Sequence, residues 1–123
     1  MIQPTELRIG NYIEYDGNYY KIDSLSRGLP TLNTLAFGIG VVDYNNINPI
    51  PLTEEILIKC GFKRIHQSKF RAVDIHIFCY LHETMNGDWI LDIDGRTISV
   101  VKSLHQLQNL YHAITGNELE INL

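Results

Sequence analysis

The sequence has little cysteine and no long apolar run. No stretch approaches the roughly 18 apolar residues of a membrane helix, and the start, MIQPTELRIG, lacks the basic residues and apolar segment of a secretion signal. We therefore expect a cytoplasmic protein with no membrane partner. The two cysteines, Cys60 and Cys79, are too few for a disulfide framework, and in a reducing compartment we expect them to be small buried apolar side chains.

Repeats, low-complexity runs and Pro- or Gly-rich linkers are also absent. With 123 residues, of which 45% are hydrophobic and 20% charged, the chain has the length and composition of one globular domain, and we expect a single domain over residues 1–123. The net charge of −4 disfavours a protein that coats nucleic acid non-specifically, although a total says nothing about how the charges are distributed.

The predicted fold class is α+β, and its clearest element is an N-terminal β-hairpin. Residues 11–15 and 18–25 alternate and are rich in aromatic and β-branched side chains, and the pair Asp16-Gly17 between them suits a two-residue type I′ turn. This hairpin is a candidate for part of a small SH3-like barrel. Residues 27–50 mix short apolar runs with glycines and prolines, and predict irregular connections around one or two short strands.

Two short helices are expected to pack on a sheet. The segment PLTEEILIKCGF has Thr53 as a cap for the free N–H groups at its start and Gly61 as a stop. The second helix begins at Ser103, with a capping box to Gln106, and ends at Gly116. The residues ELEINL that follow alternate like a short C-terminal strand.

Between the helices, the pattern predicts an antiparallel meander of three strands. Its strands are residues 69–81, 88–93 and 96–102, joined by turns at Asn86-Gly87 and Asp94-Gly95. Because side chains alternate along a strand, Trp89, Leu91 and Ile93 should share one face.

The segment HIFCYLH contains residue types that bind zinc, but its spacing does not suit a site. On a strand, His76 and His82 share a face roughly 20 Å apart, and Cys79 points to the other face, so we predict no metal. Asp92 and Asp94 resemble a fragment of a calcium loop without its other ligands. We find no nucleophile elbow, no paired carboxylates and no phosphate loop, and therefore expect no catalytic residues, no cofactor and no enzyme activity.

The second helix has an outer side without charge. His105, Gln108, Asn109 and His112 fall within an arc of roughly 100° opposite its leucine stripe. Uncharged polar side chains lose less on desolvation than Lys or Glu, so this side suits burial. It is a candidate protein-binding surface, for a partner or for self-association; alternatively, the chain's own residues 27–50 cover it.

A second candidate site is a basic stretch. No acidic residue occurs between Ile56 and Val73, and five of the ten Lys and Arg residues lie there. Lys63, Arg64, Lys69 and Arg71 could contact phosphates, with Phe62 and Phe70 able to stack on bases. The alternative, which the acidic net charge leads us to favour, is a solvated edge whose charges prevent strand-to-strand aggregation.

Three segments carry a resemblance. ELRIGNYIEYDG, INPIPLTEEILIKCGF and LHQLQNLYHAITGNELEI resemble a family of short uncharacterised proteins from prophage-like and other mobile DNA of gut bacteria. The resemblance covers about half the chain and implies a context rather than an activity. The expected function is a small non-enzymatic binding module of a mobile genetic element that acts through protein–protein contacts; the alternative is a nucleic-acid-binding accessory protein that uses the basic stretch 59–71.

Overall fold

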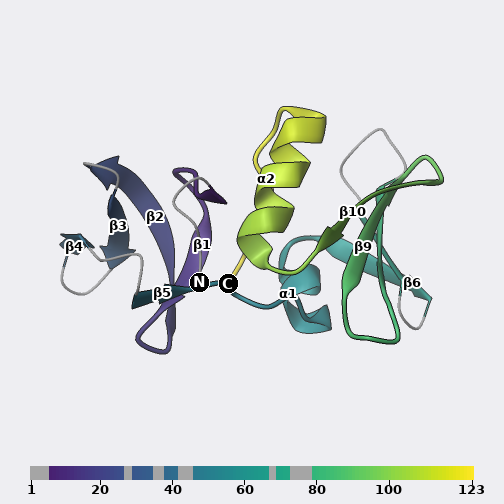
Figure 1. Cartoon of the computed structure of the whole chain (residues 1–123), viewed down its shortest axis with the longest axis horizontal. Coiled ribbons are helices and arrows are strands. Elements are labelled where there is room, and N and C mark those ends of the chain that lie inside the picture. The colour runs from purple at the N-terminus through teal and green to yellow at the C-terminus, as the bar shows by residue number, and fades with distance from the viewer. Residues whose placement is uncertain (1–5, 27–28, 35–37, 42–45, 67–68, 73–78) are drawn as a thin grey trace. The chain divides into compact units, whose positions relative to one another are not determined.

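The computed structural model describes residues 6–26, 29–34, 38–41, 46–66, 69–72 and 79–123. The chain divides into two compact units. Unit 1 comprises Met1–Pro51 and Ser103–Asn109, and unit 2 comprises Leu52–Lys102 and Leu110–Leu123. Each unit contains one antiparallel sheet, and the molecule has helices as well, so the α+β class is confirmed (Figure 1). A single domain over residues 1–123 would require the two units to fold together, and this stays a prediction.

The sheet of unit 1 has five strands in the order β4-β3-β2-β1-β5. They are β1 (Tyr12–Tyr15), β2 (Asn18–Ser26), β3 (Leu29–Thr34), β4 (Gly38–Val41) and β5 (Ile47–Asn48). The predicted hairpin is confirmed, because β1 and β2 pair in antiparallel fashion across Asp16-Gly17. These two residues have φ angles of 50° and 81°, the positive values that a type I′ turn requires.

The described part of residues 27–50 contains more strand than the sequence predicted. Three strands, β3, β4 and β5, lie there instead of one or two. Glycines and prolines led to an expectation of irregular structure, but Gly38 and Gly40 both lie in β4 and pair with Thr34 and Leu32 of β3.

The core of unit 1 lies between the N-terminal segment and the sheet. Leu7, Ile13, Ile22 and Ile47 are buried there, and Tyr15 and Tyr20 pack against them. The first residues of α2 (Leu104–Thr115) belong to this unit. The backbone N–H of Leu104 donates to the carbonyl of Ile50 over 2.8 Å, which joins the start of the helix to the chain just after β5.

Unit 2 contains a five-stranded meander in the order β10-β9-β8-β7-β6. The strands are β6 (Phe62–His66), β7 (Lys69–Ala72), β8 (Cys79–Glu83), β9 (Trp89–Ile93) and β10 (Arg96–Val101). The prediction of three strands was wrong in two respects, since β6 was missed and residues 69–81 contain two strands rather than one. That segment has no Gly or Pro to mark a turn, so its alternation looks like one continuous strand. The turns at 86–87 and 94–95 lie where predicted.

Helix α1 (Glu54–Lys59) forms as the sequence predicted and contacts β6. The Thr53 hydroxyl accepts a hydrogen bond from the Ile56 N–H over 3.2 Å, and Gly61 follows the helix with a φ of 86°. Its buried Ile56 and Leu57 belong to the apolar core of unit 2. A helix of six residues has little stability of its own, so this burial is what holds it.

The core face of the second sheet is apolar. Phe70 and Trp89 meet edge to face with ring centroids 5.7 Å apart, and Leu81 and Leu91 are buried beside them in register. The Trp89 indole N–H donates to the carbonyl of Leu52 over 3.2 Å, so its polar atom is also satisfied.

The end of the chain differs from the prediction. Residues 117–123 form no strand, although ELEINL alternates. Leu119 is buried, and the backbone N–H of Asn122 donates to the carbonyl of Lys59, the last residue of α1, over 2.9 Å. The alternation therefore reflects side-chain packing of an extended tail rather than pairing in a sheet.

At the start of α2, the Ser103 hydroxyl lies 3.1 Å from His105 Nδ1. The predicted capping box between Ser103 and Gln106 stays a prediction.

No helix in the described part of the chain is both long and apolar enough to cross a membrane.

Candidate functional site

The uncharged side of α2 is covered by the chain's own residues 6–12. His105 and Gln108 are 1% and 2% exposed, and Asn109 is half-buried. His105 and Gln108 therefore lack the exposure that a protein-binding surface needs, and the hydrogen bonds of Gln108 and Asn109 run to residues 6–12. The protein-binding role of the four residues, and their coverage by residues 27–50, stay predictions. His112 is the most exposed of the four, with 44% of its side chain accessible. Its Nε2 lies 3.9 Å from a carboxylate oxygen of Glu118.

Gln108 acts as a partner for the backbone at the entrance to β1. Its side-chain N–H donates to the carbonyl of Gly10 over 2.9 Å, and its side-chain oxygen accepts from the N–H of Tyr12 over 2.8 Å. The carboxamide therefore provides the donor and acceptor that a neighbouring strand would provide. A charged residue would satisfy only one of these two backbone groups, which explains why an amide occupies this buried position.

Asn109 adds three more bonds to the same segment. Its oxygen accepts from Arg8 Nε and from the Asn11 side-chain amide, each over 2.8 Å, and its amide donates to the carbonyl of Glu6 over 2.7 Å. Together with Gln108, it holds residues 6–12 on the helix. We call Gln108, Asn109 and their partners Glu6, Arg8, Gly10, Asn11 and Tyr12 the amide clamp.

His105 lies beside the amide clamp and is less well satisfied. Its Nδ1 contacts the Ser103 hydroxyl, whereas its buried Nε2 has no hydrogen-bond partner and lies 4.0 Å from a carboxylate oxygen of Glu6. Burial lowers the pKa of His105, and the nearby Glu6 carboxylate partly opposes this effect. The ring is therefore neutral in the folded protein at physiological pH.

The basic stretch divides between the two faces of the β6–β10 sheet. Arg64 lies on the core face, where its guanidinium forms an ion pair with Glu54 of α1 and lies 5.6 Å from the Phe70 ring centroid. Lys59 also has a partner, Glu55, at 3.2 Å. Phe62 and Phe70 are buried in the core, so neither can stack on a base.

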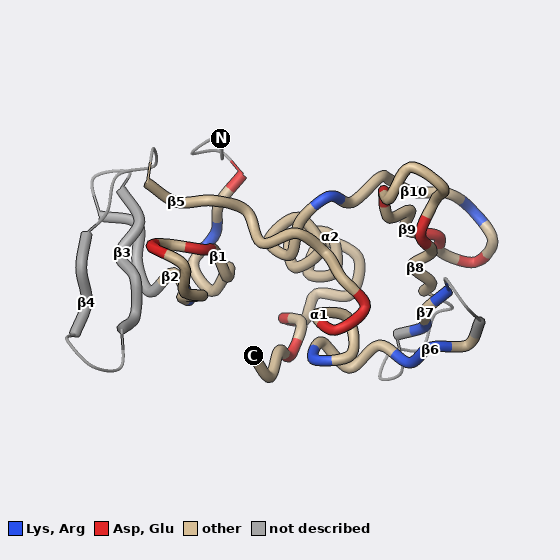
Figure 2. The backbone as a smooth tube through the Cα atoms, turned by 90° about the horizontal axis from the view of Figure 1, so that it is seen from below, with Lys and Arg blue, Asp and Glu red and all other residues tan. Residues whose placement is uncertain are grey.

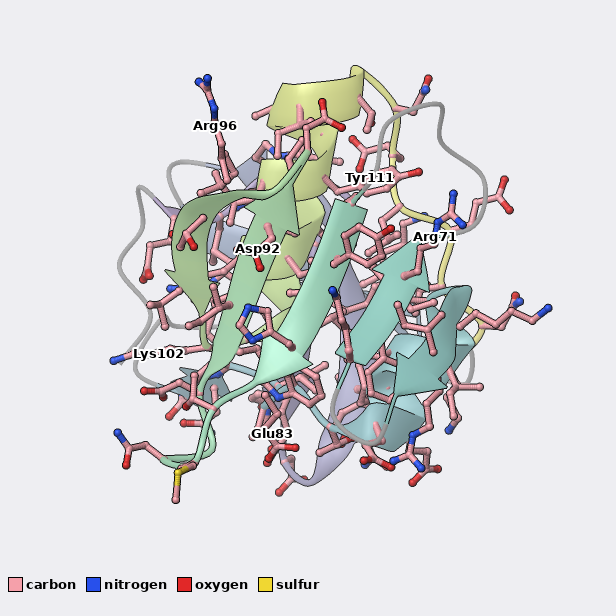
Figure 3. All side chains as sticks on the ribbon, turned by 90° about the vertical axis from the view of Figure 1, so that its right-hand side faces the viewer. Arg71, Glu83, Asp92, Arg96, Lys102 and Tyr111 are labelled. Carbon is pink, nitrogen blue, oxygen red and sulfur yellow. The ribbon has the colours of Figure 1, made fainter. Side chains whose placement is uncertain are left out.

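The remaining cations share the opposite face. We define the open face as the residues whose side chains alternate with the core positions of the second sheet: Lys63, Lys69, Arg71, Tyr80, His82, Ile90, Asp92 and Val100. Figure 2 shows Lys and Arg residues, in blue, along β6 and β7. Figure 3 looks onto the sheet, and Arg71 and Asp92 are labelled there. Three of the four predicted nucleic-acid-binding residues are therefore brought together, and Arg64 is not among them.

Two like charges stand directly opposite each other on this face. Lys63 of β6 and Arg71 of β7 are Cα partners in the antiparallel pair, and both are exposed. This alignment gathers positive charge at one place on the face. On the same strand as Arg71, the Lys69 ammonium lies 4.4 Å from the centroid of the Tyr80 ring, which places a cation and an aromatic residue side by side.

The open face also contains a histidine–carboxylate pair that sequence reasoning missed. His82 Nε2 lies 2.8 Å from Asp92 Oδ2, with the side chains 34% and 21% exposed. Both residues were noticed in the sequence, but only as parts of metal motifs. The meander register was the signal that could have joined them, because Tyr80 pairs with Asp92 and His82 with Ile90.

The prediction of no metal site was based on the separation of His76 and His82 along one strand, and the structure does not support that basis. His76 lies outside the described residues, and residues 69–81 are not the single strand on which the 20 Å separation was based. Within the described ranges, no group of three or more His, Cys, Asp or Glu is placed to hold an ion. Cys60 and Cys79 are free and buried, and burial raises their pKa values to about 12 and about 11, so both are protonated thiols.

No protein-family model, no curated protein and no solved structure matches this chain, so the open face and the amide clamp have to be interpreted from their own geometry.

Proposed function

We propose that the protein is a small accessory protein that binds single-stranded nucleic acid through the open face of the β6–β10 sheet. The observation that carries the proposal is the placement of Lys63 directly opposite Arg71, with Lys69 on the same face. The backbone of a nucleic acid offers phosphates at close spacing, and three cations gathered on one face suit contact with them.

The position of the cations also argues against a purely protective role. Lysines that prevent aggregation are needed on an edge strand, and β6 is such a strand. Lys69 and Arg71, however, lie on β7, which has neighbours on both sides. Protection of the edge therefore accounts for the position of Lys63, but not for the positions of Lys69 and Arg71 on an inner strand.

The shape of the surface favours a single strand over a duplex. The major groove of B-DNA admits a helix or a two-stranded ribbon, whereas the open face extends over a sheet of five strands. Sheet faces with cations and aromatic residues suit unpaired nucleotides, whose phosphates and bases are both accessible. Tyr80 supplies the aromatic ring here, beside Lys69.

A protein-binding module that acts through α2 is the weaker candidate, because the amide clamp buries the surface it would use. The origin in a mobile element, inferred from the resemblance of three segments, is compatible with a nucleic-acid-binding accessory role and stays a prediction. For unit 1 we also propose an SH3-like barrel, since the strand order β4-β3-β2-β1-β5 and the very short β5 beside β1 are what such a barrel requires.

The test is binding to labelled single-stranded oligonucleotides at several salt concentrations. For the wild-type protein, we expect affinity to fall steeply with ionic strength. Lys63→Glu and Arg71→Glu should each reduce the slope of log K against log [salt] by about 0.7 for every phosphate that the variant no longer neutralises, because fewer counterions are then released from the single strand.

Two control variants separate the open face from charge in general. Lys21→Glu changes the net charge equally at an exposed position of unit 1, and Arg64→Gln removes a basic residue on the core face; neither should change the slope. Absence of salt-sensitive binding, or an equal effect of Lys21→Glu and Lys63→Glu, would refute the proposed site.

A further inference from the structure

The histidine–carboxylate pair lies within the proposed nucleic-acid surface. In the sheet register, His82 is the Cα partner of Lys69, and Asp92 is the Cα partner of Tyr80, which in turn faces Arg71. A ligand held by the cations would therefore pass over or beside the imidazole. Asp92 is visible on this face in Figure 3.

The pair fixes which atom of His82 is offered to a ligand. An ionised carboxylate has only acceptors, so Nε2 must carry a hydrogen and donate it to Asp92 Oδ2 over 2.8 Å. In the tautomer with its hydrogen on Nε2, Nδ1 is then left with a lone pair. Asp92 is the one hydrogen-bond partner of His82 among the described residues, and the His82 side chain remains 34% exposed.

We infer that His82 Nδ1 accepts a hydrogen bond from the ribose 2′-hydroxyl of a bound strand, so that the open face prefers RNA to DNA. This inference rests on the proposed function. A lone pair repels phosphate oxygens and requires a donor, and in a strand whose phosphates lie on neighbouring cations the 2′-hydroxyl is the sugar donor that only RNA has. The Asp92 carboxylate strengthens the acceptor by holding the ring in one tautomer.

The bases also carry hydrogen-bond donors. A uridine strand has no amino groups, and its N3–H donor is the same whatever the sugar. The experiment therefore compares three labelled oligouridylates of equal length: the ribose form, the deoxyribose form, and a 2′-fluoro form that keeps the ribose pucker without the hydroxyl donor. The ribose strand can make one hydrogen bond that the two analogues cannot make. We therefore expect it to bind about 3- to 10-fold more tightly than either analogue.

Variants of the full chain then assign the preference to His82. His82→Leu removes the acceptor and should bring the ratio between ribose and 2′-fluoro strands to about 1 without changing the salt slope, because the cations remain. His82→Gln offers an amide oxygen in place of Nδ1 and should recover part of the preference. Ile58→Ala, at an exposed position of α1 outside the open face, should leave the ratio unchanged.

The outcomes separate this inference from the function on which it rests. Equal, salt-sensitive binding of all three strands would overturn the role of His82 and leave nucleic-acid binding standing. Tight binding of the 2′-fluoro strand would show that sugar pucker, not the hydroxyl, is recognised, and a preference that survives in His82→Leu would assign it to another residue. If no strand binds, the proposed function itself fails. The comparison of the strands on the wild-type protein remains decisive even if a variant does not fold.

Discussion

Replacement of Gln108 by leucine is the sharpest test of the amide clamp. Gln108 is 2% exposed, and its two hydrogen bonds satisfy the carbonyl of Gly10 and the N–H of Tyr12. Leucine has a similar size but no polar atom, so the variant leaves two backbone groups without their partners while it keeps the site filled. The change therefore isolates hydrogen bonding from packing.

The magnitude follows from these two groups. Each buried backbone group that loses its partner costs about 1–3 kcal/mol, so the loss amounts to about 2–6 kcal/mol. Burial of the apolar leucine side chain returns about 1.5–3 kcal/mol. We expect a net destabilisation of about 1–3 kcal/mol, against a total stability of about 5–15 kcal/mol for a domain of ordinary stability.

Urea denaturation followed by far-UV circular dichroism measures this change. With a slope of about 1–3 kcal/mol/M, the midpoint should fall by roughly 1 M. His112→Gln is the matched control, because its side chain is 44% exposed on the same helix and should change stability by at most about 0.5 kcal/mol. A shift of Gln108→Leu as small as that of the control would refute the account of the clamp.

The same experiment tests the prediction of a single domain. Trp89 is the one tryptophan in the sequence and lies in unit 2, whereas Gln108 lies in unit 1. If the units unfold together, tryptophan fluorescence should report the same shift as circular dichroism. A shift seen only by circular dichroism would mean that the two units unfold independently.

Two further predictions concern buried titratable groups. Because burial lowers the pKa of His105 in the folded state, the unfolded chain binds more protons at acidic pH. The free energy of unfolding should therefore be highest above pH about 6.5 and should fall as the pH decreases below it. Urea titrations at several pH values should show this slope, and His105→Gln should flatten it. Glu6 opposes the effect, so Glu6→Gln should make the slope steeper. Cys60 and Cys79, with pKa values raised to about 12 and about 11, should resist thiol reagents in the native protein and react on unfolding; fast labelling of the native protein at neutral pH would contradict their burial.

The sequence predicted well where local rules determine structure. Asp16-Gly17 and Asp94-Gly95 defined their turns because few other residue pairs adopt the positive φ angles that both turns show. Thr53 defined the start of α1 for a similarly local reason, since its hydroxyl bonds within the first turn. No long-range contact had to be known for these predictions.

It predicted poorly where the partner lies far along the chain. The uncharged side of α2 was correctly noticed, but the residues that cover it, 6–12, are about a hundred positions away, and no periodicity in the sequence announces that contact. The pair of His82 and Asp92 was missed for a different reason. The two residues lie only ten positions apart across one hairpin, but the predicted strand ended at residue 81, so His82 was not placed on it.

The amide clamp also has a consequence for the order of synthesis on the ribosome. Gln108 is made 98 residues after Gly10 and 96 after Tyr12, the two residues whose backbone it satisfies. At typical translation rates, the first hairpin waits about 5–20 s for this partner. During that interval, the carbonyl of Gly10 and the N–H of Tyr12 have only water or other proteins to bond. Nascent chains that stop short of residue 108 should therefore be the form of this protein that chaperones and proteases recognise.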